Sequence, residues 1–197
     1  MNDIVPALDW PTIAEELLQW ACDQTGIAWA WADQDAPQPT YPFGLIRVVS
    51  GPLKLGTDEI RWDGDETLNH FGVRELTLSF ECLVDKDAGG SMADEYNAHS
   101  LLLMLQSSLR LQSTKERFQR ANVAVREDDQ PIQNLDENVA DRWISRALVE
   151  FVFYTSTTLQ ETVGFFEAVE VSSEISRPDG SPAPVQLENE VLELSGE

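Results

Sequence analysis

The sequence predicts an α+β domain with an antiparallel-dominated β-sheet, packed by two or three helices, with a projecting hairpin or loop and a C-terminal arm. First, apolar and polar residues alternate through residues 75–84, the pattern of a half-buried strand. Second, residues 12–23 and 91–111 carry apolar residues at helical spacing next to capping signals. Third, the order is helix, strands, helix, strands, with no internal repeat, which favours α+β over alternating βαβ units.

The first expected helix covers residues 12–23. Thr12 with Glu15 three residues later has the pattern of a capping box, and Asp9, which precedes a proline, is an alternative start. Gly26 is the expected stop, because glycine readily adopts the left-handed conformation that ends many helices.

Strands are expected at residues 27–31, 44–50 and 75–84. Between the first two, residues 33–42 contain three prolines, which donate no backbone hydrogen bond, so we expect an extended surface loop. Residues 53–74 are polar and interrupted by glycine, which predicts a long hairpin or projecting loop. In the third strand one face is apolar and is formed by Leu76, Leu78, Phe80, Cys82 and Val84.

The central helix is expected at about residues 91–111, with Ser91 as its cap. Its stretch 101–105 is entirely apolar, so the helix is apolar nearly all round. Such a helix is either sandwiched within the domain or buried by a partner. A short second helix is expected at about residues 113–120.

The last third of the chain predicts more strands. Val123 and Val125 indicate a brief strand, and residues 127–141 an acidic loop. Residues 142–156 and 162–172 are expected as two strands of an antiparallel hairpin. From Ser173 the sequence becomes linker-like and then acidic. We therefore expect a domain over residues 1–172 and an acidic arm over residues 173–197.

The charge balance restricts the possible partners. The chain has 197 residues, with 13 Lys and Arg against 35 Asp and Glu, and a net charge of -22. Such a chain is repelled by nucleic-acid phosphates and anionic membranes unless its cations cluster. No apolar run approaches the ~20 residues of a membrane span, and the N-terminus lacks the basic and apolar regions of a signal peptide.

The side chains that usually carry catalysis are isolated. Only His70 and His99 are present, without metal-ligand spacing, and no phosphate-binding glycine loop or nucleophile motif occurs. Cys22 and Cys82 are expected to be reduced core thiols. The acidic residues between 58 and 66 do not have calcium-loop spacing and indicate a solvated loop. We therefore expect no catalytic residues, no cofactor and no metal, and hence no enzyme.

Two features favour contacts with other proteins. Residues 110–126 are net positive in a strongly negative chain, so they suit head-to-tail docking between copies, although these cations can equally pair with acids of their own chain. Trp62 follows Arg61 in a polar segment and suits an interface anchor. The basic residues of the first feature are Arg110, Lys115, Arg117, Arg120 and Arg126.

Several motifs, in order, resemble tailed-bacteriophage neck or tail terminator proteins. The resemblance covers roughly residues 10–172 and departs from the family pattern at Ile144-Ser145 and in the arm. The motifs are Trp31-Ala-Asp-Gln-Asp-Ala-Pro-Gln-Pro39, Tyr41-Pro-Phe-Gly-Leu-Ile-Arg47, Ser50-Gly-Pro52, Gly72-Val-Arg-Glu75, Trp143 with Arg146, and Val163-Gly-Phe-Phe-Glu-Ala-Val-Glu-Val171.

The resemblance implies a structural virion protein of the phage neck. Such a subunit forms a ring, typically a hexamer, that caps the tail tube, stops tail polymerisation and joins the tail to the head connector. Its implied partners are its own copies, the tail tube protein, the neck proteins and the tail sheath, while genome DNA passes through its channel without specific binding. An unpaired sheet edge, or the arm, can add a strand to a neighbour.

Three alternatives remain at this level. Another head-tail joining component, such as a head-completion, stopper or adaptor protein, is also a small ring-forming protein. An acidic DNA-mimic inhibitor requires carboxylates spaced like phosphates along one face, whereas the acids here are scattered. A hydrolase is the least favoured, because the two histidines are isolated.

Overall fold

The computed structural model describes residues 8–34, 39–62, 67–85, 96–139 and 141–162. The chain divides into two units, Met1–Val163 and Gly164–Glu197, and all described residues belong to the first. The expected boundary between a domain and an arm at residues 172 and 173, and the expected strand beyond Thr162, therefore lie outside the described residues.

A seven-stranded mixed sheet forms the first unit, with its main strands in the order β1-β2-β3-β7-β4. Short strands β5 and β6 also pair with β7. Strand β1 is parallel to β2, and the other pairs are antiparallel. The strands are β1 (Ala28–Trp31), β2 (Phe43–Trp62), β3 (Thr67–Asp85), β4 (Val123–Val125), β5 (Gln133–Asn134), β6 (Glu137–Val139) and β7 (Arg142–Thr162).

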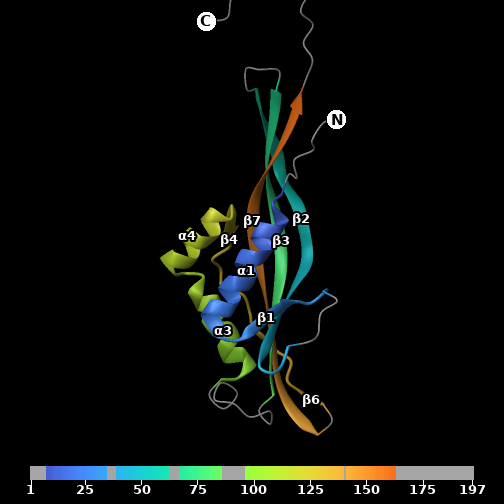
Figure 1. Cartoon of the computed structure of the whole chain (residues 1–197), viewed down its shortest axis with the longest axis vertical. Helices are drawn as coiled ribbons and strands as arrows, with labels where there is room; N and C mark the ends of the chain where they lie inside the picture. The colour runs from blue at the N-terminus through green and yellow to red at the C-terminus, as the bar shows by residue number, and fades with distance from the viewer. Residues whose placement is uncertain (1–7, 35–38, 63–66, 86–95, 140, 163–197) are drawn as a thin grey trace, which may run out of the picture. The chain divides into compact units, whose positions relative to one another are not determined.

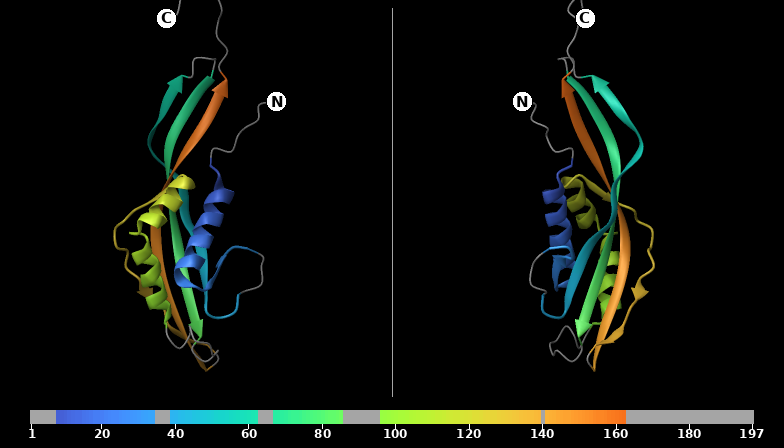
Figure 2. Two further views of the ribbon diagram at one scale, coloured as in Figure 1. Left: turned by 60° about the vertical axis from the view of Figure 1, so that its left-hand side comes forward. Right: turned by 90° about the vertical axis from the view of Figure 1, so that its right-hand side faces the viewer.

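Three described helices, α1 (Trp10–Thr25), α3 (Ala98–Ser108) and α4 (Gln112–Arg120), cover one face of this sheet (Figures 1 and 2). We call it the helix face; in β3 it carries the apolar residues from Leu76 to Val84 that the sequence pattern predicted, and all five are buried. We call the opposite side the open face; in β3 it carries Glu75, Thr77, Ser79 and Glu81. The predicted α+β fold with an antiparallel-dominated sheet is confirmed.

Helix α1 begins at the alternative start. The Asp9 carboxylate accepts a hydrogen bond from the Thr12 backbone N–H at 3.3 Å, so Asp9 is the cap. Gly26 ends the helix at φ 71°, in the left-handed conformation, and its N–H donates to the Cys22 carbonyl at 2.8 Å. The predicted stop at Gly26 is therefore confirmed.

Helix α3 is shorter than the expected 91–111. Its cap is Asn97, whose side chain accepts from the Ser100 N–H at 2.8 Å while the Ser100 hydroxyl contacts the Asn97 N–H at 3.0 Å. The expected cap, Ser91, lies outside the described residues. Because Asn97 and Ser100 satisfy two backbone groups reciprocally, they define the helix start more strongly than a single serine.

Strands β2 and β3 form the long hairpin that residues 53–74 predicted, with residues 63–66 between them outside the described part. Together with the end of β7 they continue past the helices as a three-stranded extension of the sheet (Figure 2). The expected projection is thus a hairpin and not a loop.

The expected turn between residues 156 and 162 is wrong. Strand β7 continues through this stretch and pairs with β3 in an unbroken register from Ile144 opposite Asp85 to Thr162 opposite Thr67. Residues 157–161 are polar except for Leu159 and alone resemble a turn, but pairing along β3 holds them extended. Strands β5 and β6 also occupy part of the expected acidic loop 127–141.

The core lies between the helix face and the helices. Trp20 of α1 is fully buried and makes edge contacts with Phe80, Phe118 and Phe151, at ring distances of 5.1–6.4 Å. Its indole N–H donates to the Ser108 hydroxyl of α3 at 3.1 Å. Trp20 therefore connects α1, α3, α4 and the sheet.

Candidate interaction surface

The tip of the β2–β3 hairpin carries the first predicted anchor pair. Arg61 donates to both carboxylate oxygens of Glu59 at 2.9 and 3.0 Å, and its guanidinium lies 5.4 Å from the Phe71 ring centre. This hydrogen bonding, with the charge of Arg61, lowers the pKa of Glu59. Trp62 is 48% exposed. Arg61 is therefore held by its own chain, while Trp62 presents a large aromatic surface.

The predicted basic residues of 110–126 lie on α4 and on the segments that flank it. Three of them form ion pairs with the acidic stretch just after β4. The pairs are Arg110–Asp129 at 2.7 Å, Lys115–Glu127 at 2.7 Å and Arg126–Asp128 at 2.6 Å. Because these pairs are largely exposed, each contributes little to stability. The positive charge that the sequence suggests is thus locally balanced.

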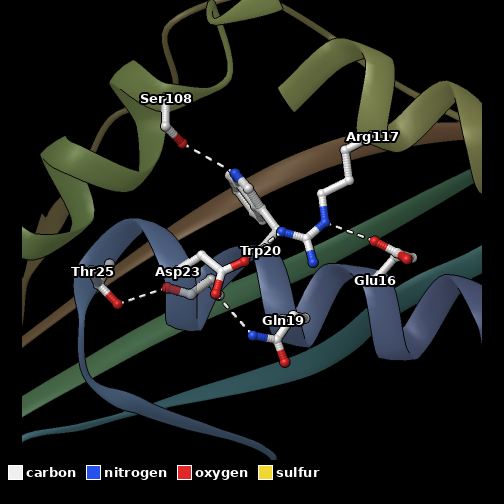
Figure 3. A network of polar contacts seen from close by, with 8 residues as sticks. Glu16, Gln19, Trp20, Asp23, Thr25, Ser108 and Arg117 are labelled. Atoms are coloured by element: carbon white, nitrogen blue, oxygen red, sulfur yellow. Dashed lines mark hydrogen bonds and ion pairs between the residues drawn. The ribbon is translucent and has the colours of Figure 1, made fainter. Parts of the chain in front are cut away.

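Arg117 differs from these, because it connects two helices. Its Nε donates to Glu16 and its Nη1 to Asp23, both on α1 and both at 2.7 Å (Figure 3). The hydrogen bond from Arg117, with a second from Gln19, lowers the pKa of Asp23. The Arg117 side chain is 20% exposed, so its first role is to hold α4 against α1. The sequence could not show this, because these partners lie about a hundred residues away.

Arg120 remains the most available of the predicted cations. Its Nε lies 3.4 Å from the Glu116 backbone carbonyl, and no described carboxylate pairs with it. It is exposed and lines a surface hollow of about 320 Å³ together with Gln24 and Ser113. Of the basic group, Arg120 is therefore best placed to meet a partner.

An ion-pair cluster at the base of the hairpin extension was not predicted. Asp58 accepts from Arg74 at 2.9 and 3.2 Å, and the Lys54 ammonium lies 3.0 Å from it. The hydrogen bonds from Arg74 and Lys54 lower the pKa of Asp58 to about 2. The cluster occupies the space above Gly72, where a Cβ would lie 2.1 Å from the Asp58 carboxylate. Asp58 is thus a partner of cations of its own chain.

The described residues contain no group of three or more potential metal ligands. His70 lies 3.6 Å from Glu161, and His99 is exposed on α3. Both cysteines are free thiols; Cys82 is fully buried, and this burial raises its pKa to about 12. Three of the acids between 58 and 66 lie outside the described residues.

Comparison with protein families identifies the chain. Residues 12–176, which are most of the sequence, match the family described as phage neck terminator protein. The chain belongs to the phage neck terminator family. A search of curated proteins gave no match. The resemblance found in the sequence motifs is therefore confirmed.

Membership in this family makes the chain a structural protein of the phage neck, which associates with other neck and tail proteins. The family is one of structural and not typically of enzymatic proteins. No described helix of this neck terminator is long and apolar enough to cross a membrane.

This neck terminator also exposes apolar side chains on α3. Leu101, Leu102 and Leu105 are buried against the sheet, whereas Leu103 and Met104 on the other side are exposed. Within the described part of the chain the helix is therefore not sandwiched. That a partner covers its outer side stays a prediction.

Proposed function

We propose that the protein is the ring-forming tail terminator of a tailed phage. A ring of its copies, typically six, caps the last ring of the tail tube, stops further polymerisation and presents a docking face to the head connector. The observation that carries this proposal is the family match over residues 12–176. The proposed location is the head-proximal end of the tail.

The two faces of the sheet support an orientation of the subunit in the ring. The helix face is covered by α1, α3 and α4, while the open face carries none of the described helices. Along the middle of β3 and β7 it carries the carboxylates of Glu75 and Glu150, of which Glu150 is exposed, with Leu148 and Val152 on either side of Glu150 along β7. We place the open face toward the channel, where carboxylates repel phosphates and genome DNA passes without specific binding.

The predicted interface residues are part of the same proposal. Arg120 and Trp62 are the exposed candidates for contacts with copies, the tail tube or neck proteins. Arg61, Arg110, Lys115 and Arg126 have acidic partners in their own chain, so contacts through them require exchange of these exposed pairs. Arg117 takes part only indirectly, by holding α4.

The test is removal of the gene from the phage. If the protein terminates tails, its loss gives overlong tails that do not join heads, and complementation restores tails of uniform length. If tails keep normal length but heads lose their DNA, the protein is a stopper or head-completion protein instead. Mass photometry of the purified protein, alone and with tail tubes, tests the ring, and a tight complex with a nuclease would favour the DNA-mimic alternative.

A further inference from the structure

The extension formed by β2, β3 and β7 has two open edges. On the outer side of β2, strand β1 pairs only with Phe43–Ile46, and no described strand pairs beyond it, from Arg47 to Arg61. On the outer side of β7, strands β6, β5 and β4 pair with successive parts of β7, and the last of these pairings ends at Thr155. Beyond Ser156 no strand of the described chain covers residues 157–161.

Most of the open edge of β2 is protected against pairing with another chain. Its register against β3 shifts three times between Val48 and Glu59, and this stretch includes Pro52, which cannot donate, and an exposed Lys54. Bulges, proline and lysine are the devices by which proteins prevent edge-to-edge association. The protection stops at Glu59, where regular pairing resumes, so the following edge is open to another strand.

The regular open edges of β2 and β7 lie at the same level of the sheet. Ile60 pairs with His70 of β3, and His70 pairs with Leu159 of β7, so these three residues form one row. Because β2 and β7 are both antiparallel to β3, they run in the same direction. A second copy in the same orientation can therefore place its β7 edge beside the β2 edge of the first.

We infer that residues 59–61 of β2 in one copy pair in parallel with residues 158–160 of β7 in a second copy. This inference rests on the ring proposed above and assigns one of its subunit contacts. The contact is heterologous, since different edges meet, and repetition of a heterologous contact is what closes a ring. A β2–β2 or β7–β7 contact requires a twofold axis and would not continue round the ring.

The side chains support this pairing. Ile60 is 58% exposed and Leu159 is 47% exposed, and both lie on the helix face. The pairing sets Leu159 of one copy beside Ile60 of the next, so that two exposed apolar residues cover each other. On the open face Thr158 and Gln160 are uncharged, so Arg61 and Glu59 meet no like charge.

A pair of cysteines can detect this contact without ambiguity. Within one chain, β3 separates residues 60 and 159 by two strand spacings, roughly 10 Å, which is beyond disulfide reach. A disulfide between Ile60→Cys and Leu159→Cys must therefore join two copies. Pairing Ile60→Cys with Glu161→Cys tests the register displaced by two residues.

The experiment uses the full chain with Cys22→Ser, oxidised mildly and resolved on a non-reducing gel. The matched control is Leu53→Cys with Leu159→Cys, because Leu53 is equally exposed on β2 but lies in the protected stretch. We expect a ladder of dimers and larger species from the double variant, and heterodimers from a mixture of the two single variants. Each single variant alone, and the control pair, should stay uncrosslinked.

Four results would overturn this inference. Crosslinking of the Ile60→Cys variant alone would show a twofold β2 contact. Crosslinking of the double variant only after removal of residues 163–197 would show that the chain's own end occupies one of the two open edges. A ladder from the Leu53 control equal to that of the double variant would show random collision. A ring seen by mass photometry without any crosslink would leave the proposed function standing and reject this contact. A protein that stays monomeric even on tail tubes would instead reject the ring itself.

Discussion

Arg74 and Asp58 form a two-pronged ion pair directly over Gly72, with Nη1 2.9 Å from Oδ1 and Nη2 3.2 Å from Oδ2. The pair bridges the irregular part of β2 to β3, where the sheet leaves the cover of the helices. Its carboxylate lies where a Cβ of residue 72 would be, so the glycine and the ion pair depend on each other.

Asp58→Asn should lower the melting temperature in a pH-dependent way. Arg74 and Lys54 depress the folded-state pKa of Asp58 to about 2, below its ordinary 3.8. The ionised carboxylate therefore stabilises the fold above pH 3.8, and this stabilisation is lost as the pH falls toward 2. Melting curves from pH 2 to 6 should show a gap between wild type and variant that closes at the acid end. A gap independent of pH would contradict the ion-pair role; Glu150→Gln, at an exposed acid without an ion pair in the described chain, serves as the control.

Gly44→Ala should destabilise the fold more than Gly72→Ala. A Cβ on Gly44 would lie 2.2 Å from the ring of Trp29, which is buried and cannot move aside, so we expect a loss of about 3 kcal/mol. At Gly72 the obstructing atoms are the charged ends of Asp58 and Arg74, which can swing away, so we expect about 1 kcal/mol. Urea unfolding measures both values.

Equal losses at the two positions would mean that the Arg74–Asp58 pair is as rigid as the Trp29 ring. Gly56→Ala gives a reference for backbone strain alone, because Gly56 has φ +68° and no atom lies within 4 Å of the added Cβ.

Ser108→Ala should cost about 1–3 kcal/mol, because it leaves the Trp20 indole N–H buried without its acceptor. Ser107→Ala is the matched control, since Ser107 is the exposed neighbour on the same helix and should change stability by less than about 0.5 kcal/mol. Thermal melts compare the two. The hydrogen bond carries no net stability if both serines give the same small effect.

Charge reversal should separate Arg117 from Arg120. Arg117→Glu places a third negative charge beside Glu16 and Asp23, so it should loosen α4 from α1 and destabilise the monomer by about 2 kcal/mol. Arg120→Glu places a negative charge one turn from Glu116, but on an exposed surface and without breaking an ion pair of the described chain, so it should cost only about 0.5 kcal/mol.

The same two variants then test the interface. Arg120→Glu should reduce attachment of the protein to tails, seen by electron microscopy of complemented particles. Normal particles carrying Arg120→Glu would remove this side chain from the neck contacts. Assembly defects of Arg117→Glu are informative only after its folding has been measured.

The sequence predicts best the helices and strands whose own residues carry the pattern that defines them. The helix face of β3 follows from alternation between Leu76 and Val84, and α1 ends at Gly26 because that residue supplies the left-handed conformation. Strand β7 shows the opposite case. Its polar end through Thr158 resembles a turn, and only pairing with the equally long β3 makes it a strand.

The interaction surface is predictable only in part, because it too depends on contacts between residues that are distant in the sequence. The sequence shows which side chains are charged or aromatic, but Arg117 meets Asp23 and Arg74 meets Asp58 only when helices and strands have packed. The open edges of β2 and β7 are likewise properties of the assembled sheet. No spacing rule in the sequence reveals which edge of a strand remains uncovered.

Strand β3 is paired on both sides along its length, and its second partner, β7, is the last strand that the structure describes. During translation, one edge of β3 therefore has no pairing partner until residues 142–162 have been synthesised. Two of the six aromatic residues buried in the main core, Phe151 and Phe153, belong to the same late segment. Pairings this far apart in sequence form slowly and expose nascent chains to aggregation. Because β7 comes after every other strand that the structure describes, the sheet of each subunit can be completed only once residues 142–162 have been synthesised.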